Sequence, residues 1–361
     1  MWCGEYGINT FSYYHKLTST QKRDIIKRLD ELIWFKEIVS DDREKTYVYL
    51  SDFYACRGIK IWVSRYKGKS WSLIIVVHPM LVLDDPCRSA LYQPVDKKEY
   101  RKIVKEVDRL LETVNVPCSV DKMKLCRVDI ASTLFCGVGT PLDEYIQILK
   151  KSVLLPHYKL GSFREREHKA KDYKRANKHS YKQYCKSAAF FAYDKTAQLE
   201  MVDAFPAALI DERTLRLEVQ LQQKGMEKWV GRDGMDGSNW SILKKLGEDP
   251  EEILLWYLDR LQPAGVYYLC YSDAADMIET KVKGKKNRER MLYLLRKTSD
   301  SESLTTALEK LREKYDLSKG QYKTVLNSFH ELGISPITLA NNSDYDDVFS
   351  LSHLLRCLFY E

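Results

Sequence analysis

Three short runs of the sequence combine apolar residues with polar residues at alternate positions. They are Leu125–Ile130, Phe190–Lys195 and Leu215–Gln220. Because successive side chains of a β-strand point to opposite faces of a sheet, each run has an apolar face and a polar face. A chain with three such strands is constrained to pack one sheet face on other elements and to gather its polar side chains on the other.

The polar faces of these runs carry two carboxylates, three cations and one tyrosine. They are Arg127 and Asp129 in the first run, Tyr193 and Lys195 in the second, and Arg216 and Glu218 in the third. If the apolar faces pack on helices, all six side chains point to the same open side of one sheet. A ladder of cross-strand salt bridges is the simplest use of this surface.

The same side chains also suit the cleavage of a phosphodiester bond. Two carboxylates can hold Mg²⁺ or Mn²⁺, which take oxygen ligands and keep positions open for a substrate phosphate. A tyrosine hydroxyl can act as a nucleophile when a metal, cation or base offsets its pKa of about 10. Lys195, Arg127 and Arg216 could stabilise charge on the phosphoryl oxygens. Attack by Tyr193 would link it to one DNA end and leave a free hydroxyl on the other.

In order and approximate spacing, the three runs resemble motifs of rolling-circle replication initiators. Rep_trans plasmid initiators, and similar filamentous-phage gene II/X-like replication proteins, carry R-(L/V/I)-D, then R-I-Y-(D/N)-K, then R-(V/F)-E. Here the motifs are Arg127–Asp129, Phe191–Lys195 and Arg216–Glu218. The resemblance implies that Tyr193 is the nucleophile that nicks DNA, and that Asp129 and Glu218 bind the metal ion.

One stretch departs from the family pattern. The family has a glutamate in the strand before a long helix, whereas Ile74–Pro79 contains no acid here. Either the metal ion has fewer protein ligands, or His78 replaces the glutamate. The missing acid supports an alternative, a non-catalytic DNA-binding regulator on a degenerate initiator fold. A structural protein without a nucleic-acid role is a third interpretation.

A basic segment with interleaved aromatic residues runs directly into the tyrosine strand. Residues 158–186 contain ten lysines and arginines against three acids. Cations neutralise phosphates and aromatic rings stack on unpaired bases, so we expect this segment to bind single-stranded or hairpin origin DNA. The expected contacts are Arg164, Arg166, Tyr173, Lys174, Arg175, Lys178, Tyr181 and Lys182. A solvated loop is the alternative, and a host helicase is a further candidate partner.

Hydrophobic periodicity divides the chain into two parts. Strand-like runs and amphipathic helices alternate up to about residue 225, and helical segments dominate afterwards. The sequence therefore predicts an α+β fold with an antiparallel central sheet, helices packed on one of its faces, and an all-α C-terminal region. We expect a nicking domain over residues 1–225 and a helical domain over residues 226–361.

Composition indicates a folded cytoplasmic protein. The chain has 361 residues, a net charge of +7 and nine scattered cysteines without a CxxC pair, which is typical of reduced thiols. The sequence shows neither a signal-peptide pattern nor 18 consecutive apolar residues. We therefore expect no membrane partner.

Overall fold

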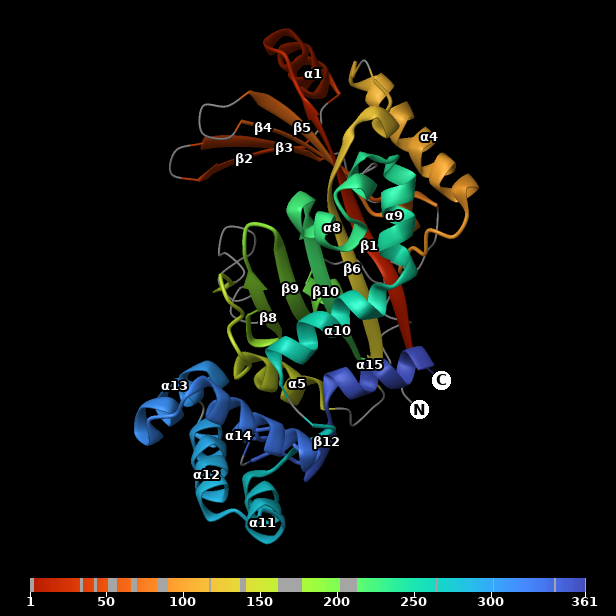
Figure 1. The fold of residues 1–361 in the computed structure, drawn as a ribbon. Coiled ribbons are helices and arrows are strands. Elements are labelled where there is room, and N and C mark those ends of the chain that lie inside the picture. The colour runs from red at the N-terminus through yellow and green to blue at the C-terminus, as the bar shows by residue number, and fades with distance from the viewer. Residues whose placement is uncertain are drawn as a thin grey trace.

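A computed structural model gives the fold of the chain (Figure 1). It describes residues 3–32, 35–41, 44–50, 57–65, 70–83, 90–116, 118–136, 141–161, 177–201, 213–263, 265–300, 302–340 and 342–360. A long twisted sheet with helices on one side occupies the upper and middle parts of the view, and a group of helices lies below it. The predicted α+β class is confirmed.

The central sheet contains ten strands among the described residues, and every neighbouring pair is antiparallel. They are β1 (Cys3–Lys16), β2 (Phe35–Asp41), β3 (Glu44–Leu50), β4 (Ile59–Arg65), β5 (Trp71–Val77), β6 (Lys124–Cys136), β7 (Lys159–Leu160), β8 (Ser180–Tyr184), β9 (Ala188–Asp194) and β10 (Arg213–Gln222). Their spatial order is β2-β3-β4-β5-β1-β6-β10-β9-β8-β7. The three runs singled out in the sequence therefore lie side by side in β6, β10 and β9.

Helices accompany this sheet along its length. They are α1 (Ser19–Glu31), α3 (Pro79–Val82), α4 (Lys97–Thr113), α5 (Leu142–Lys150), α7 (Lys195–Met201), α8 (Gln223–Val230), α9 (Asn239–Glu248) and α10 (Pro250–Leu261), with 3-10 turns at Val120–Lys122 and Asp233–Asp236. The longest of them, α4, starts where the Asp96 side chain accepts a hydrogen bond from the Lys98 backbone, and it buries an apolar stripe. The hydroxyl of Tyr13 on β1 donates a 3.3 Å hydrogen bond to the hydroxyl of Tyr100 on α4, which places α4 on the apolar face of the sheet.

Elements on the two sides of the predicted domain boundary near residue 225 pack against each other. Helix α8 spans that point in the sequence and α9 and α10 follow it, yet α8 and α10 pack against β6 and β10, and α9 packs against β6 (Figure 1). Leu217 on β10 and Leu254 on α10 have no solvent exposure. The sheet therefore obtains part of its apolar cover from residues that the sequence assigned to the second domain.

The lower group consists of short helices and one small two-stranded sheet. Its elements are β11 (Tyr267–Leu269), α11 (Tyr271–Lys281), α12 (Lys285–Ser299), α13 (Leu304–Tyr315), α14 (Lys319–Glu331), β12 (Asp347–Phe349) and α15 (Leu351–Tyr360). The last helix, α15, returns to pack against α10 (Figure 1). None of the helices that the structure describes has both the length and the apolar character needed to cross a membrane.

Candidate functional site

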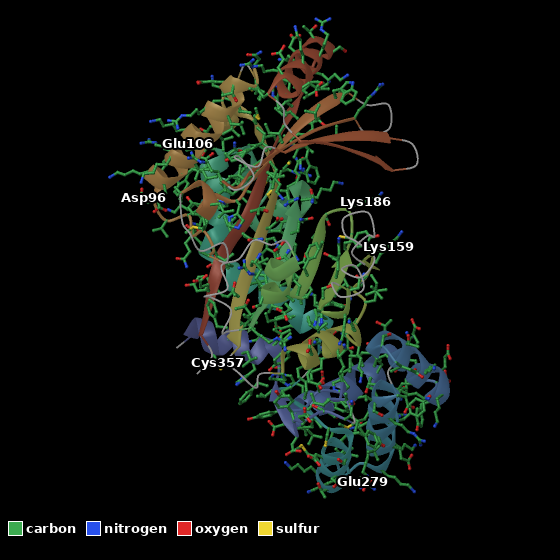
Figure 2. All side chains as sticks on the ribbon, turned by 180° about the vertical axis from the view of Figure 1, so that it is seen from behind. Asp96, Glu106, Lys159, Lys186, Glu279 and Cys357 are labelled. Atoms are coloured by element: carbon green, nitrogen blue, oxygen red, sulfur yellow. The ribbon has the colours of Figure 1, made fainter. Side chains whose placement is uncertain are left out.

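The polar sides of β6, β9 and β10 share the sheet face that lies opposite α4 and α10. Arg216 on β10 pairs with Tyr193 on β9, and Gln220 pairs with Asp129 on β6. Since side chains alternate along a strand, Glu218 lies on the same face as Arg216 and Gln220. Figure 2 shows the molecule from behind, with Lys159 and Lys186 beside β8 at the edge of the sheet.

Tyr193 is hydrogen-bonded to one of the predicted metal ligands. Its hydroxyl donates to Oε2 of Glu218 over 3.2 Å, and Nδ2 of Asn9 donates to the same oxygen over 2.9 Å. Nη1 of Arg216 donates to Oδ1 of Asn9 over 3.4 Å. The predicted nucleophile, one acid and one arginine therefore form a continuous network through Asn9.

Asp129 lies next to this network and is only 2 % exposed. Its Oδ2 accepts a 2.7 Å hydrogen bond from Nη2 of Arg127 and another from the Thr10 hydroxyl. Its other oxygen, Oδ1, is buried and has no hydrogen-bond partner within the described ranges. A buried carboxylate oxygen without a partner is costly, so this atom is positioned for a ligand.

Asn9 and Thr10 could not be predicted as site residues from alternation, because strict alternation fails at this point of β1. The pairing of β1 with β6 shifts between Ile8 and Thr10, which is the signature of a β-bulge. Gly7 has a φ of 150°, and a Cβ there would lie 2.6 Å from the carbonyl oxygen of Tyr92. A glycine inside a strand pattern is the sequence signal that indicates such a bulge.

Lys195 lies at the start of helix α7, so the expectation that the strand continues through Lys195 is wrong. β9 ends at Asp194, whose Oδ1 accepts a hydrogen bond from the Ala197 backbone and so favours a helical turn. Asp194 faces the other side of the sheet, where Arg213 donates to it over 2.9 Å. Nζ of Lys195 donates to Oε1 of Gln198 over 3.0 Å.

The polar face is buried, so the expectation of an open surface is also wrong. Arg216 has no exposure, Glu218 is 8 % exposed and Tyr193 is 9 % exposed. Burial and then the neighbouring Glu218 carboxylate raise the pKa of Tyr193 well above its ordinary value. Burial and then Asp129 raise the pKa of Glu218 to about 6. At neutral pH the tyrosine is therefore protonated and the glutamate is ionised.

His78 follows β5 and lies near the cations of the site. Burial and then the charges of Lys195 and Arg216 lower the pKa of its imidazole to about 3, so the ring is neutral at physiological pH. Its Nδ1 is buried and has no hydrogen-bond partner within the part of the chain that the structure describes. The structure therefore places His78 beside the predicted site.

The donor atoms fit a metal ion held by two carboxylates. In the described segments, no three His, Cys, Asp or Glu side chains are grouped so that they could hold a metal ion, and His78 therefore does not complete a three-ligand set with Asp129 and Glu218. Mg²⁺ is commonly held by one or two carboxylates, with substrate phosphates and water as its remaining ligands. The unpartnered oxygen of Asp129 and the neighbouring Glu218 suit that mode.

The predicted DNA contacts are described only in part. Five of them lie outside the described residues, namely Arg164, Arg166, Tyr173, Lys174 and Arg175. Lys178 is exposed. Lys182 on β8 places Nζ 4.8 Å from the ring centre of Phe191, which pairs with Glu218 across β9 and β10. Lys182 therefore lies on the same face as Glu218, two strands away from it.

Tyr181 is not available to stack on DNA. It is 5 % exposed and its ring packs 6.4 Å from that of Phe190 in an edge-on arrangement. Its hydroxyl accepts a hydrogen bond from the Gln183 side chain. The expected DNA contact at Tyr181 is therefore wrong, because Tyr181 pairs with Ala192 and lies on the apolar face of the sheet.

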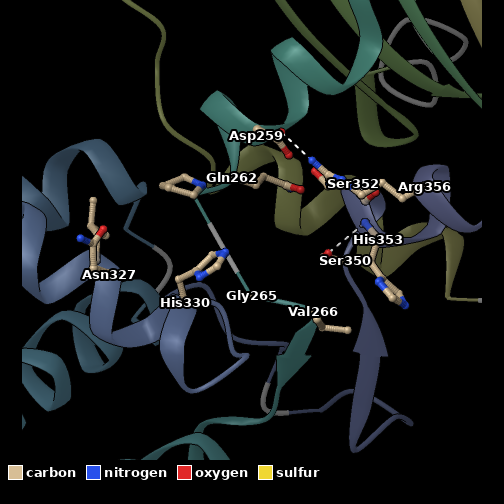
Figure 3. A pocket seen from close by; sticks show the side chains of 12 residues that line it. Asp259, Gln262, Gly265, Val266, Asn327, His330, Ser350, Ser352, His353 and Arg356 are labelled. Carbon is tan, nitrogen blue, oxygen red and sulfur yellow. Dashed lines mark hydrogen bonds and ion pairs between the residues drawn. The ribbon is translucent and has the colours of Figure 1, made fainter. Parts of the chain in front are cut away.

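A separate cavity of about 550 Å³ lies between α10, α14 and α15 (Figure 3). Asp259 and Arg356 form an ion pair of 2.8 Å across one wall. His330 projects from α14, and His353 from α15. The Tyr193 network contributes no lining residue to this cavity, so the two are distinct places in the fold.

The comparisons with known proteins give no further assignment. No protein-family pattern matches the sequence, and no curated protein matches it at a significant level. A function for the chain therefore has to be argued from the site itself.

Proposed function

We propose that this protein initiates rolling-circle DNA replication as a metal-dependent nickase and strand transferase, in the manner of Rep_trans and gene II/X-like initiators. The main support is the hydrogen bond from the Tyr193 hydroxyl to Glu218, on the face that also holds Asp129. A nucleophile whose hydroxyl is hydrogen-bonded to a carboxylate has a base in place to accept its proton.

Each residue of the site has a separate role in the proposed reaction. As the Tyr193 oxygen bonds to phosphorus, its proton passes to Glu218, and the bond from phosphorus to the leaving sugar oxygen breaks. Glu218 can then return the proton to that oxygen, which gives a free hydroxyl and a phosphotyrosine link. Arg216 and Arg127 stabilise the charge on the phosphoryl oxygens. When bound to Asp129 and Glu218, Mg²⁺ or Mn²⁺ supplies polarisation of the phosphate.

The charge balance of the site suits an anionic substrate. Arg127, Arg216 and Lys195 carry three positive charges, and Asp129 and Glu218 carry two negative charges above the pKa of Glu218. A net positive site with little water strengthens the attraction for a phosphate. Its low exposure means that DNA has to reach the network as a strand with accessible phosphates rather than as a rigid duplex.

The test is covalent capture of DNA. The wild-type chain is incubated with Mn²⁺ and a pool of single-stranded and hairpin oligonucleotides, and adducts are detected after denaturation. We expect adducts for the wild type and none for Tyr193→Phe, because the phenylalanine has no nucleophilic oxygen. Tyr181→Phe is the matched control, since it changes a buried tyrosine on the neighbouring strand β8. Wild-type adduct levels in Tyr193→Phe would refute the proposal.

Two observations favour a second function, a non-catalytic DNA-binding regulator on the same fold. The raised pKa of Tyr193 disfavours the phenolate, and the described residues bring only two acids to the network. This function predicts DNA binding by the wild-type chain in Mn²⁺ with no nicked product. The same incubation therefore separates the two functions.

A further inference from the structure

A row of paired residues crosses the polar face on the side of β6 away from Tyr193. Lys60 on β4 pairs with Val76 on β5, Val76 pairs with Ser12 on β1, and Ser12 pairs with Arg127 on β6. Directly paired residues project from the same face of a sheet. Lys60 and Arg127 therefore lie at the two ends of this row, and the side chains of Val76 and Ser12 lie between them.

This row contains cations and donors that lack acceptors. Oγ of Ser12, Nε of Arg127 and Nε1 of Trp62 are buried without a hydrogen-bond partner in the described ranges. Trp62 lies two residues from Lys60 on β4 and so shares its face. Lys60 is exposed at its end of the row and forms no ion pair with the same described residues. Buried donors normally find acceptors, so several unpaired ones in one place indicate a missing anion.

The two cations are close enough to serve one anion. Three strand spacings separate them, which is roughly 14 Å between Cα atoms, and two long side chains can span most of this distance. Partial withdrawal from water and then the charge of Arg127 lower the pKa of Lys60, so the two side chains interact. An anion between them would offset the repulsion between the two cations and accept hydrogen bonds from the unpaired donors.

Aromatic rings lie one pair further along the same strands. Trp62 pairs with Ile74 on β5, and Ile74 pairs with Tyr14 on β1. Both rings are partly exposed and share the face of Lys60. Rings beside phosphate-binding cations are the usual arrangement for single strands, because unpaired bases stack on them.

We propose that the Lys60–Arg127 row binds a backbone phosphate of single-stranded DNA, separate from the phosphate that reacts at Tyr193. The proposal rests on the proposed function for the identity of the strand. Arg127 connects the two places, because its Nη2 donates to Asp129 while its Nε has no described partner. The DNA strand then runs across β10, β6, β1, β5 and β4, with a base beside Trp62.

Salt-dependent binding of a 20-nucleotide oligo-dT to the full chain tests this row. The measurement is made in EDTA, so that no metal-dependent nicking occurs. Each phosphate contact adds about 0.7 to the slope of log K against log salt for single strands. Lys60→Met should therefore lower the slope by about 0.7 and weaken binding about fivefold at 0.1 M salt. Lys60→Arg should keep the wild-type slope.

The matched control is Lys102→Met, which removes an exposed lysine from α4 on the other face of the sheet. Its slope should equal that of the wild type. Trp62→Phe provides a second measurement that does not depend on the folding of Lys60→Met. It keeps a ring but loses the Nε1 donor, so its affinity should fall while its slope stays unchanged.

Two outcomes overturn the inference. One is a wild-type slope for Lys60→Met, and the other is unchanged oligo-dT affinity for Trp62→Phe. Adduct formation with Mn²⁺ is measured separately on the wild-type chain. Failure of that reaction would count against the nickase function, whereas the salt slopes decide the phosphate position on their own.

Discussion

The two faces of β10 are both buried at the centre of the strand but are chemically opposite. Leu217 and Val219 have no exposure on one face, and Arg216 and Glu218 are 0 % and 8 % exposed on the other. The first face packs on helices, where burial stabilises the fold by about 25 cal/mol per Å² of apolar surface. The second face buries charges, whose desolvation cancels much of their mutual attraction.

This difference separates apolar packing from the proposed chemistry within one strand. A buried network of charges contributes little net stability and can often be replaced by apolar residues without loss. Its presence opposite a complete apolar face is therefore better explained by chemistry than by folding. Substitutions on the polar face should affect DNA chemistry more than stability, and substitutions on the apolar face should do the reverse.

Tyr193→Phe should give the largest effect on function. The adduct should disappear, while the free energy of unfolding changes by about 1 kcal/mol, because one hydrogen bond is lost and the ring still packs. Adduct assays and urea unfolding measure the two quantities on the same preparation. A loss of stability as large as that of an apolar core variant would remove the contrast between the faces.

Leu217→Ala should produce the reverse result. Truncation of a fully buried leucine costs about 2–5 kcal/mol in the free energy of unfolding, since it removes apolar contacts and leaves a cavity. Adduct formation per folded molecule should remain close to that of the wild type at low temperature. Leu217→Met conserves volume and is the control, with an expected cost below about 1.5 kcal/mol. Loss of adduct in folded Leu217→Ala would show that the two faces are coupled.

Glu218→Gln should stabilise the protein at neutral pH. The pKa of Glu218 is about 6 in the folded chain and 4.5 for an ordinary glutamate, so the folded state binds the proton more tightly. Its contribution to stability is therefore full below pH 4.5 and is lost as pH rises through 6. The difference corresponds to about 2 kcal/mol, because one pKa unit is about 1.4 kcal/mol.

The measurement is the unfolding free energy of both proteins between pH 4.5 and pH 8. The advantage of Glu218→Gln should grow from pH 4.5 to about pH 6.5 and then stay constant, and its adduct formation should be lost. Glu112→Gln is the matched control, because Glu112 is an exposed glutamate on α4, which packs on the other face of the sheet. A pH-independent difference between the Glu218 variant and the wild type would contradict the raised pKa.

Regular parts of the sheet could be predicted from the sequence. Alternation placed Arg127 with Asp129, and Arg216 with Glu218, because β6 and β10 keep an uninterrupted register with each other. It could not show that this face is buried, because a polar face has the same pattern whether or not other segments cover it. The helical layer from α8 to α10 was assigned to the second domain for a similar reason, since periodicity identifies a helix but not its partner.

Local irregularities account for the remaining differences. The side chain of Asp194 caps a helix, so Lys195 leaves the strand that its sequence pattern continues. The bulge after Ile8 adds Asn9 to the polar face, where a strictly alternating strand would have placed it among apolar residues. The helix cap and the bulge both depend on local hydrogen bonds, which cannot be predicted from the hydrophobic pattern.

Asn9→Ala should give the smallest effect and the finest test of the polar face. It removes the donor to Glu218 Oε2 and leaves Tyr193 as the described hydrogen-bond partner of that oxygen. A donor to an ionised carboxylate favours the charged form, so its loss should raise the pKa of Glu218. The rate of adduct formation should fall by about tenfold, in line with about 1.5 kcal/mol for a hydrogen bond to a charged group.

The pH dependence distinguishes positioning of Glu218 from a general structural role. In Asn9→Ala the midpoint of the rate against pH should move upward, whereas a loosened fold would lower the rate equally at every pH. Gln93→Ala changes an exposed side chain that contacts the backbone of β1 at Tyr6, and it should leave the midpoint unchanged. An unshifted midpoint in Asn9→Ala would mean that the bulge shapes the strand without tuning the carboxylate, and the polar face would then depend on Tyr193 and Asp129 rather than on the Asn9 network.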